Sequence, residues 1–402
     1  MGEPKLRFKA DDGSDFPDWD EMTLGDVGSV AMCKRVFKEQ TCEVGDVPFF
    51  KIGTFGGAPD AYISQSLFDE LKSKYAYPKV GTILLSASGT IGRQVEYKGE
   101  DAYYQDSNIV WLEHDDTVLD SYLKQFYSVV KWQGLEGSTI KRLYNKTILD
   151  TLFYRPSLPE QRKIADFLSA VDAVIAAQQA EVDAWEQRKK GVMQKLFSQE
   201  VRFKADDGSD FPDWEEKTLG ELGTFLKGAP LSKSDITDEG TPFILYGELY
   251  TTYEEVAYNI VRHTDRKVPD KFYSKAGDVV VPTSGETPEE ISTATCVMRD
   301  GVILAGDLYI YRPVTEIDGR IVSYLLNHQV NNAISRIAQG KSVVHVQSKE
   351  LELIRIVFPS SPIEQRKIAN CLASLDDVIA KAKDELEVWR ELKRGLLQQM
   401  FV

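Results

Sequence analysis

The sequence predicts a mixed α/β (α+β) protein: two α/β blocks joined by two long helices that pair as an antiparallel coiled coil, with a pseudo-two-fold internal repeat. Three observations support this fold class. Thirteen residues occur twice without change, at Arg7–Trp19 and Arg202–Trp214. The sequence EQRKIA occurs at 160–165 and again at 364–369. An apolar heptad pattern follows each copy of EQRKIA, which is typical of a coiled coil. Because these features recur in the same order, one structural unit is expected to be built twice.

The repeats divide the chain into an acidic segment, a variable block and a long helix, and then the same three again. The predicted boundaries are 1–28, 29–156, 157–200, 201–223, 224–360 and 361–402. Residues 1–28 carry three basic and eight acidic side chains, and residues 202–223 carry three and seven, so both segments contribute strongly to the formal net charge of −15. Two interpretations stay open: these segments face a partner protein, or they are solvated loops.

Each variable block is predicted to be mixed α/β with short strands. Lys79–Ser86 and Lys275–Pro282 align as a turn followed by a buried apolar strand, and a small polar loop follows each strand. The apolar periodicity of Asp120–Trp132 and Gly319–Arg336 indicates a helix in each block. Each block closes with a turn rich in glycine, serine and lysine, at 137–142 and 340–345.

The two long helices are predicted from proline at the entry and from the heptads that follow. Pro159 and Pro362 suit a first helical turn, whose amides need no partner within the helix. Lys189 and Lys393 interrupt the apolar seam at equivalent places, and Gln178 takes the position that is Ala382 in the second copy; such polar core positions fix register. Two independent amphipathic helices that dock on other surfaces are the alternative. The predicted core positions are Ile164, Leu168, Val171, Ile175, Val182, Trp185, Val192 and Leu196 in the first helix, and Ile368, Leu372, Leu375, Ile379, Leu386, Trp389, Leu396 and Met400 in the second.

Composition argues against membrane and metal-binding classes. No apolar run approaches the ~20 residues that a membrane span needs, and the polar, acidic start of the chain does not fit a signal peptide. The four cysteines, Cys33, Cys42, Cys296 and Cys371, form no CxxC pair, so neither a zinc site nor another metal site is expected. Structural thiols in a reducing cytoplasm are the expectation.

Motifs for catalysis are missing. Gly340-Lys341-Ser342 resembles the end of a phosphate-binding loop, but Ser335 stands where its first glycine belongs. Asp11–Asp15 resembles the start of a calcium loop, yet Met22 stands where the bidentate glutamate belongs. The chain has no Pro-Pro pair, which an adenine methyltransferase loop requires to hold a flipped base. We therefore predict neither a catalytic residue nor a cofactor in this chain.

The order of the segments resembles the specificity subunit of type I restriction-modification systems over the whole chain. Thr23–Gly28 and Thr218–Gly223 open the two blocks with similar residues. Pro156–Ile164 and Pro362–Ile368 resemble the helix entry Pro-x-x-Glu-Gln-x-x-Ile of that family, with three residues and one residue, respectively, between the proline and the glutamate. Gly81–Gly89 and Gly277–Gly285 resemble its strand-and-Ser-Gly element. Each motif is weak by itself, whereas their doubled order is specific.

The resemblance implies a non-catalytic, cytoplasmic DNA-recognition subunit. Each block would be a target recognition domain that reads one half of a bipartite, asymmetric site in double-stranded DNA, and the coiled coil would set the half-site separation. A rigid rod can hold two readers about one DNA turn (~34–36 Å) apart. Two modification subunits, docked on the repeats and helices, would carry the methyltransferase chemistry and S-adenosylmethionine. A restriction subunit, where present, would use ATP and Mg for translocation and cleavage.

Candidate DNA contacts follow from the need for polar side chains on exposed loops. Candidate base readers are Ser86, Ser88, Thr90 and Arg93 in the first block and Thr283, Ser284 and Glu286 in the second. Candidates for phosphate or base contact are Lys141, Arg142, Lys341, Ser342 and His345, and candidate phosphate clamps are Lys34, Arg35, Lys227 and Lys233. For each of them, an ordinary surface polar residue is the alternative.

Two functions of other classes stay open. The chain could be a structural adapter whose coiled coil and repeats bind proteins, with variable blocks that recognise partners other than DNA. An enzyme hidden in the variable blocks is the other alternative. The nearly balanced charge of the blocks fits all three.

Overall fold

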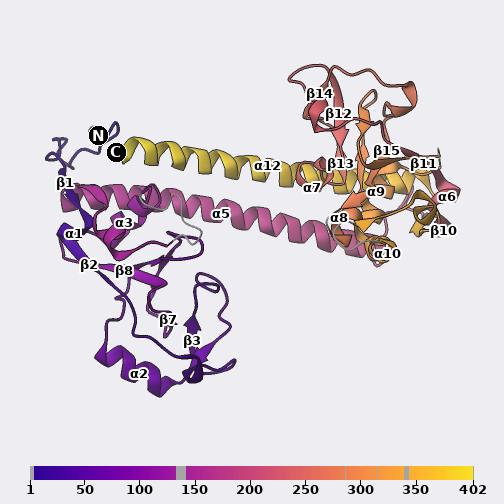
Figure 1. The fold of residues 1–402 in the computed structure, drawn as a ribbon. Helices are drawn as coiled ribbons and strands as arrows, with labels where there is room; N and C mark the ends of the chain where they lie inside the picture. Colours follow the sequence, from indigo (N-terminus) through magenta and orange to yellow (C-terminus); the bar gives the residue numbers. More distant parts are fainter. Residues whose placement is uncertain (1–3, 133–141, 286, 315, 339–343, 402) are drawn as a thin grey trace. The chain divides into compact units, whose positions relative to one another are not determined.

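The computed structural model describes residues 4–132, 142–285, 287–314, 316–338 and 344–401. It divides into two compact units (Figure 1). Unit 1 comprises Met1–Ala180 and Asp384–Val402, and unit 2 comprises Glu181–Lys383. Each unit therefore contains one acidic repeat, one variable block and a part of both long helices. Among the described helices, none is long and apolar enough to cross a membrane.

Unit 1 is built around a four-stranded antiparallel sheet and a three-stranded sheet. The first has the order β2 (Gly28–Ala31), β8 (Ile109–His114), β5 (Ile83–Ser86), β6 (Gln94–Glu96). The second has the order β4 (Tyr62–Ile63), β3 (Val47–Phe50), β7 (Tyr103–Tyr104). β1 and β9 form a separate antiparallel pair. The remaining elements are β1 (Asp20–Thr23), α1 (Leu24–Val27), α2 (Gln65–Lys74), α3 (Asp120–Tyr127), α4 (Asn145–Leu149) and β9 (Leu152–Arg155).

Unit 2 repeats this topology with additions. Its main sheet has the order β11 (Gly223–Lys227), β19 (Leu308–Pro313), β15 (Asp278–Pro282), β17 (Thr295–Val297), β13 (Val256–Ala257). Its second sheet has the order β14 (Arg262–Thr264), β12 (Thr241–Leu245), β18 (Ile303–Ala305). The remaining elements are β10 (Glu215–Thr218), α6 (Leu219–Leu222), α7 (Glu248–Thr251), β16 (Ser284–Gly285), α8 (Pro288–Ile291), α9 (Gly319–His328), α10 (Asn331–Ile337), β20 (Val344–His345), α11 (Ser348–Leu351) and β21 (Arg355–Phe358).

The predicted turn and buried strand occur in both units. All residues of β5 and β15 are buried in the middle of their sheets. Gly81 and Gly277 precede these strands with φ of +95° and +99°, a conformation that favours glycine. The predicted helices in the two blocks are shorter than their periodic segments. The first ends at Tyr127, and the second breaks at Gln329-Val330 into α9 and α10.

The long helices are α5 (Leu158–Phe197) and α12 (Pro362–Met400), and they begin within a few residues of the predicted starts. In unit 1, Lys393 Nζ lies 2.5 Å from Asp172 Oδ1, and Arg390 Nη2 donates to Gln179 Oε1 over 2.8 Å. Residue numbers rise along one helix as they fall along the other, so the two segments are antiparallel.

The same antiparallel pairing occurs in unit 2. Lys189 Nζ lies 2.5 Å from Asp376 Oδ1, and Lys383 Nζ lies 2.9 Å from Glu186 Oε1. Lys189 and Lys393, the two lysines predicted at core positions, therefore each find an aspartate on the other helix. The partner carboxylates explain how a lysine is accommodated in an otherwise apolar seam.

Most of the predicted heptad core positions are buried. Ten predicted positions are buried, namely Ile164, Leu168, Val171, Val182, Leu196, Ile368, Leu372, Ile379, Leu386 and Met400. Six are partly exposed, namely Ile175, Trp185, Val192, Leu375, Trp389 and Leu396. Towards the end of each helix, Met193 and Leu397 are buried beside Val192 and Leu396, because there each helix also packs on the core of a block. Gln178 Oε1 is buried without a hydrogen-bond partner among the described residues.

An acidic repeat is joined to the start of a long helix in each unit. The Arg7 guanidinium donates to both carboxylate oxygens of Glu160, over 3.0 and 2.9 Å, and Arg202 makes the same contacts with Glu364 over 3.0 and 2.8 Å. Both glutamates are completely buried. The Trp19 indole also donates to Glu160, over 2.9 Å. The acidic repeat and the EQRKIA segment occur in the same order in both halves of the chain. The structural reason is that each acidic repeat binds the glutamate of the EQRKIA segment that follows it.

The glutamine that follows each glutamate binds the variable block. Gln161 accepts from the Leu119 amide over 2.9 Å and donates to the Thr117 carbonyl over 3.0 Å. Gln365 likewise accepts from the Asp318 amide over 2.7 Å and donates to the Glu316 carbonyl over 3.0 Å. Each Glu-Gln pair therefore holds a repeat, a block and a helix together.

Candidate nucleic-acid interface

The loop after β5 is shaped by Ser86. Its hydroxyl donates to the Thr90 carbonyl and accepts from the Arg93 amide over 2.8 Å. With 2% of its surface exposed, Ser86 stabilises the loop from inside. Thr90 and Arg93 are exposed, and Ser88 is half-buried. One Arg93 amino group donates to the Phe55 carbonyl over 2.8 Å, which anchors this side chain at the surface.

The structure brings Ser88 and Arg142 together, although 54 positions separate them in the printed numbering. They form an antiparallel bridge, beside which the Leu143 amide donates to the Ala87 carbonyl over 2.8 Å. The Ser88 hydroxyl donates to Asn108 Oδ1 over 2.9 Å. Three segments of the block therefore meet at one polar surface.

Ser107 and Asn108, which contact Arg142 and Ser88, were not among the sequence-predicted residues. Arg142 Nη2 donates to the Ser107 carbonyl over 2.7 Å, and Ser107 has the unusual φ of +60°. A positive φ at serine depends on surrounding contacts, so the sequence offers no local signal for it.

Unit 2 has an equivalent surface. Ser284 pairs with His345 between β16 and β20, and the Val346 amide donates to the Thr283 carbonyl over 3.2 Å. Thr283 and Ser284 are 9% and 8% exposed, whereas His345 is exposed. The Tyr250 hydroxyl donates to the Ser284 carbonyl over 2.9 Å, and this hydrogen bond holds β16 in place. Lys141, Glu286, Lys341 and Ser342 lie outside the described residues.

The two surfaces share a backbone frame and differ in side chains. The Ala87 and Thr283 amides donate to the equivalent carbonyls of Asn108 and Asp307, over 2.7 and 2.8 Å. At the next position, Ser88 faces Arg142 in unit 1, whereas Ser284 faces His345 in unit 2. The same frame therefore presents a guanidinium in one unit and an imidazole in the other.

The four predicted phosphate clamps are all exposed. Lys34 Nζ lies 5.1 Å from the centre of the Tyr75 ring, and Arg35 Nε lies 3.3 Å from Asp106 Oδ2. Lys227 ends β11, and Lys233 begins the short 3-10 helix Lys233–Asp235. The arrangement leaves Lys34 and Lys227 at the surface of their blocks, where an ammonium can approach a phosphate.

A basic segment of unit 2 was missed in the sequence. Arg262, Arg266, Lys267 and Lys271 are all exposed on β14 and the residues that follow it. The Arg266 guanidinium donates to Asp235 over 2.9 Å. The Ser232 amide, and also Arg266, hold the pKa of Asp235 below its ordinary value. Counting charges over a ten-residue window would have found this segment.

The described residues contain no group of three or more His, Cys, Asp and Glu side chains that could hold a metal ion. Cys33 and Cys296 are buried, and burial raises the pKa of the Cys33 thiol to about 12. Burial also raises the pKa of Cys296. Such thiols stay protonated and pack as small apolar side chains.

Comparisons with known proteins give the family. The family described as the type I restriction modification DNA specificity domain matches residues 17–184 and 212–388. A proposed type I restriction enzyme specificity subunit of Haemophilus influenzae is 55% identical over 152 residues, which are 38% of this chain and 40% of that protein. A proposed type I restriction enzyme MjaX specificity subunit of Methanocaldococcus jannaschii is 24% identical over 425 aligned residues, which cover 97% of this chain and 94% of that protein.

A solved structure shows the same fold. The S subunit of a type I restriction-modification system from M. genitalium superposes with a TM-score of 0.62 at 18% identity, covering 100% of this chain and 99% of that one. The family match falls on both copies of the repeated architecture and on well over half of the residues. The chain therefore belongs to the type I restriction-modification DNA specificity family.

Proposed function

We propose that this chain is the non-catalytic DNA-recognition subunit of a type I restriction-modification complex. Each block reads one half of a bipartite, asymmetric site in double-stranded DNA. One observation carries the proposal: the family matches twice, and each match contains the same backbone frame with a different side chain, Arg142 in one and His345 in the other. A constant frame with variable donors suits the reading of two different base sequences.

The partners follow from this role. Two modification subunits supply the adenine-N6 methyltransferase chemistry and bind S-adenosylmethionine, and they dock on the coiled coil and the acidic repeats. The acidic surface of the repeats fits a protein partner better than DNA, whose phosphates it would repel. A restriction subunit with ATP and Mg joins where the locus encodes one, and the complex works in the cytoplasm.

The test is methylation mapping of DNA from cells with and without the gene, by single-molecule sequencing. The expected result is an interrupted N6-methyladenine motif that disappears on deletion. Replacement of residues 29–156 by the first block of another family member should then change only one half of the motif. Unchanged methylation, at a locus shown to be expressed with its modification subunits, would contradict the proposal and favour an adapter whose blocks bind other partners.

A further inference from the structure

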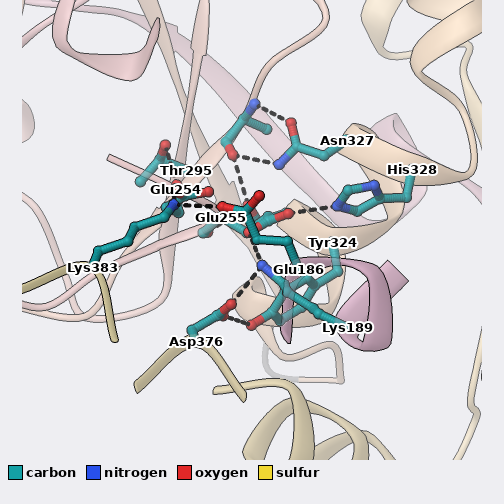
Figure 2. Close-up of polar contacts among 12 residues, drawn as sticks. Glu186, Lys189, Glu254, Glu255, Thr295, Tyr324, Asn327, His328, Asp376 and Lys383 are labelled. Carbon is teal, nitrogen blue, oxygen red and sulfur yellow. Dashed lines mark hydrogen bonds and ion pairs between the residues drawn. The ribbon is translucent and has the colours of Figure 1, made fainter. Parts of the chain in front are cut away.

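A buried ammonium in unit 2 connects both long helices to the variable block. Lys189, on α5, is 7% exposed. Its Nζ lies 2.6 Å from Glu255 Oε2 and 2.5 Å from Asp376 Oδ1 (Figure 2). Glu255 directly precedes β13 of the block, and Asp376 belongs to α12. One side chain thus joins three parts of the unit: its own helix α5, helix α12 and the block.

Helix α9 of the block contacts the same carboxylates. His328 Nε2 lies 2.5 Å from Glu255 Oε1, and the Tyr324 hydroxyl donates to Asp376 Oδ2 over 2.6 Å (Figure 2). Both oxygens of each carboxylate are therefore bound, one by Lys189 and one by α9. Within this cluster the block is attached to the helix pair through one charged contact, Lys189 with Glu255, and one neutral hydroxyl, that of Tyr324 on Asp376.

The charges of Lys189 and Glu255 support each other. Burial alone would raise the pKa of Glu255, but hydrogen bonds from His328 and Lys189 outweigh it and lower the pKa to about 2. Burial alone would lower the pKa of Lys189, but Glu255 and Asp376 outweigh it and raise the pKa. Lys189 and Glu255 are therefore both charged at neutral pH.

Such a cluster is a poor means of gaining stability. The desolvation of buried ions offsets most of their attraction, and apolar residues of similar volume often serve stability equally well. Ion pairs and hydrogen bonds differ from apolar packing in their dependence on direction and distance. A cluster that joins a block to two helices in this way defines one orientation of the block.

Unit 1 has a reduced form of the same arrangement. Lys393 Nζ lies 2.5 Å from Asp172 Oδ1, and Gln125 Nε2, on α3, donates to Asp172 Oδ2 over 3.0 Å. Gln125 takes the place of Tyr324, and Val129 takes the place of His328 when α3 is aligned with α9. The inter-helix pair is thus present in both units, whereas the imidazole contact belongs to unit 2.

We propose that Lys189, Glu255 and Asp376 are positioning residues, which fix how the second recognition domain is held on its helix pair and thereby where it meets its half-site. This inference rests on the proposed function. Lys393 and Asp172 have the same role in unit 1, with fewer contacts. Loss of a cluster contact lets the second domain meet DNA in displaced positions, so that sites with an altered spacer become substrates.

The experiment uses the full chain assembled with its modification subunits and measures methyl transfer to DNA duplexes. One duplex carries the motif found by methylation mapping, and two others carry a spacer that is one base pair longer or shorter. The variants are Glu255→Gln and Tyr324→Phe, which keep side-chain size and remove one charge or one hydroxyl. The matched control is Lys195→Gln, because Lys195, also on α5, makes an exposed ion pair with Glu200 and none with the described residues of the block.

We expect Glu255→Gln to raise the rate on the altered spacers, relative to the cognate duplex, by roughly fivefold, which is within the range of coupling between contacting residues. Tyr324→Phe changes the ratio in the same direction and by less, and Lys195→Gln leaves it unchanged. A proportional loss on all duplexes in both variants would show a merely structural role and overturn the inference. A wild-type complex that methylates no interrupted duplex would instead overturn the proposed function.

Discussion

The amide of Leu6 donates a hydrogen bond to the carbonyl of Gln399 over 3.0 Å, and this bond is the equivalent of the one from Val201 to Lys195 over 3.1 Å. In unit 2 the bond spans a continuous turn at Ser198–Glu200. In unit 1 it joins two segments from opposite ends of the printed sequence. The local structure is the same in both places, so its formation does not require the connection.

A circular permutant tests this equivalence. Phe401 would be joined to Leu6 through Ser-Gln-Glu, copied from Ser198–Glu200, and the chain would be opened between Glu200 and Val201. We expect a melting temperature within about 4 °C of the wild type, a shift of ~1 kcal/mol at most. A permutant opened inside the buried strand β5 is the control, which should not fold. Failure of both permutants would contradict the equivalence.

Substitution of Arg7 or of Arg202, which bind the buried glutamates, should destabilise the protein, and Arg202→Met should do so more than Arg7→Met. Each substitution leaves a buried glutamate without its main partner, which costs about 3–5 kcal/mol. Glu160 keeps the Trp19 indole, whereas Trp214 Nε1 has no hydrogen-bond partner among the described residues. The difference should be about 1–2 kcal/mol, measured by urea unfolding followed by tryptophan fluorescence. The double variant Arg202→Met/Glu364→Met should recover most of the loss, and equal stability of both single variants would count against this account.

Acid should weaken unit 2 through Glu255. Its pKa is about 2 in the folded protein and 4.5 ordinarily, so its stabilising contribution is present above pH 4.5 and is lost as the pH falls towards 2. Between these limits the wild type should lose about 3 kcal/mol that Glu255→Gln does not lose. Burial raises the pKa of Asp376, so this group changes the unfolding free energy with pH in the opposite direction. The change occurs in both the wild type and Glu255→Gln and therefore largely cancels when the two are compared. The expectation would be disproved if the unfolding free energies of the wild type and of Glu255→Gln changed in parallel between pH 4.5 and pH 2.

Arg93→Ala should relax or abolish recognition of one half-site and leave the other intact. A side chain that reads a base edge contributes about 1–3 kcal/mol, or roughly 5- to 150-fold in discrimination. The measurement is methylation of duplexes with single substitutions in each half of the motif. His345→Ala is the counterpart for the second half-site. Equal loss at both half-sites would rule out the assignment of Arg93.

Lys227→Ala should weaken DNA binding uniformly across sequences. If Lys227 neutralises one phosphate, the slope of log K against log salt concentration should fall by about 0.9. Binding would be measured by fluorescence anisotropy at several salt concentrations. Arg355→Ala is a suitable control, because Arg355 is exposed on β21 and already lies 3.6 Å from Glu216. A change in slope as large for the control as for Lys227→Ala would refute a specific phosphate contact.

Local patterns predicted the skeleton of the molecule. Prolines and heptads placed the starts of α5 and α12, and the glycine turns at Gly81 and Gly277 placed the two central strands, because these signals act within a few residues. The pairing of Ser88 with Arg142, and of Ser284 with His345, follows from loops that the sequence had singled out separately.

Long-range partners could not be predicted. The sequence showed that Lys189 and Lys393 interrupt the seam. It did not show that Asp376 and Asp172 lie opposite them, because each alternative antiparallel register of the two helices would bring other residues there. Ser86 looked like an exposed reader, and its burial became visible only with the turn that it closes. The roles of Gln161 and Gln365 depend on carbonyls more than 40 positions away.

The two equivalent joints, Arg7 with Glu160 and Arg202 with Glu364, connect the repeats to the long helices and leave the variable blocks out of this connection. Among the described residues, Arg7 and Arg202 fasten each repeat to its helix without a residue of the variable block, and the glutamine next to each glutamate binds backbone groups of the block. At these joints a block of foreign sequence needs no matching side chains, whereas contacts such as that of Tyr324 with Asp376 still depend on the side chains of the block itself. Exchange of a whole block therefore preserves both joints, while the remaining contacts between the block and the helices depend on the new sequence.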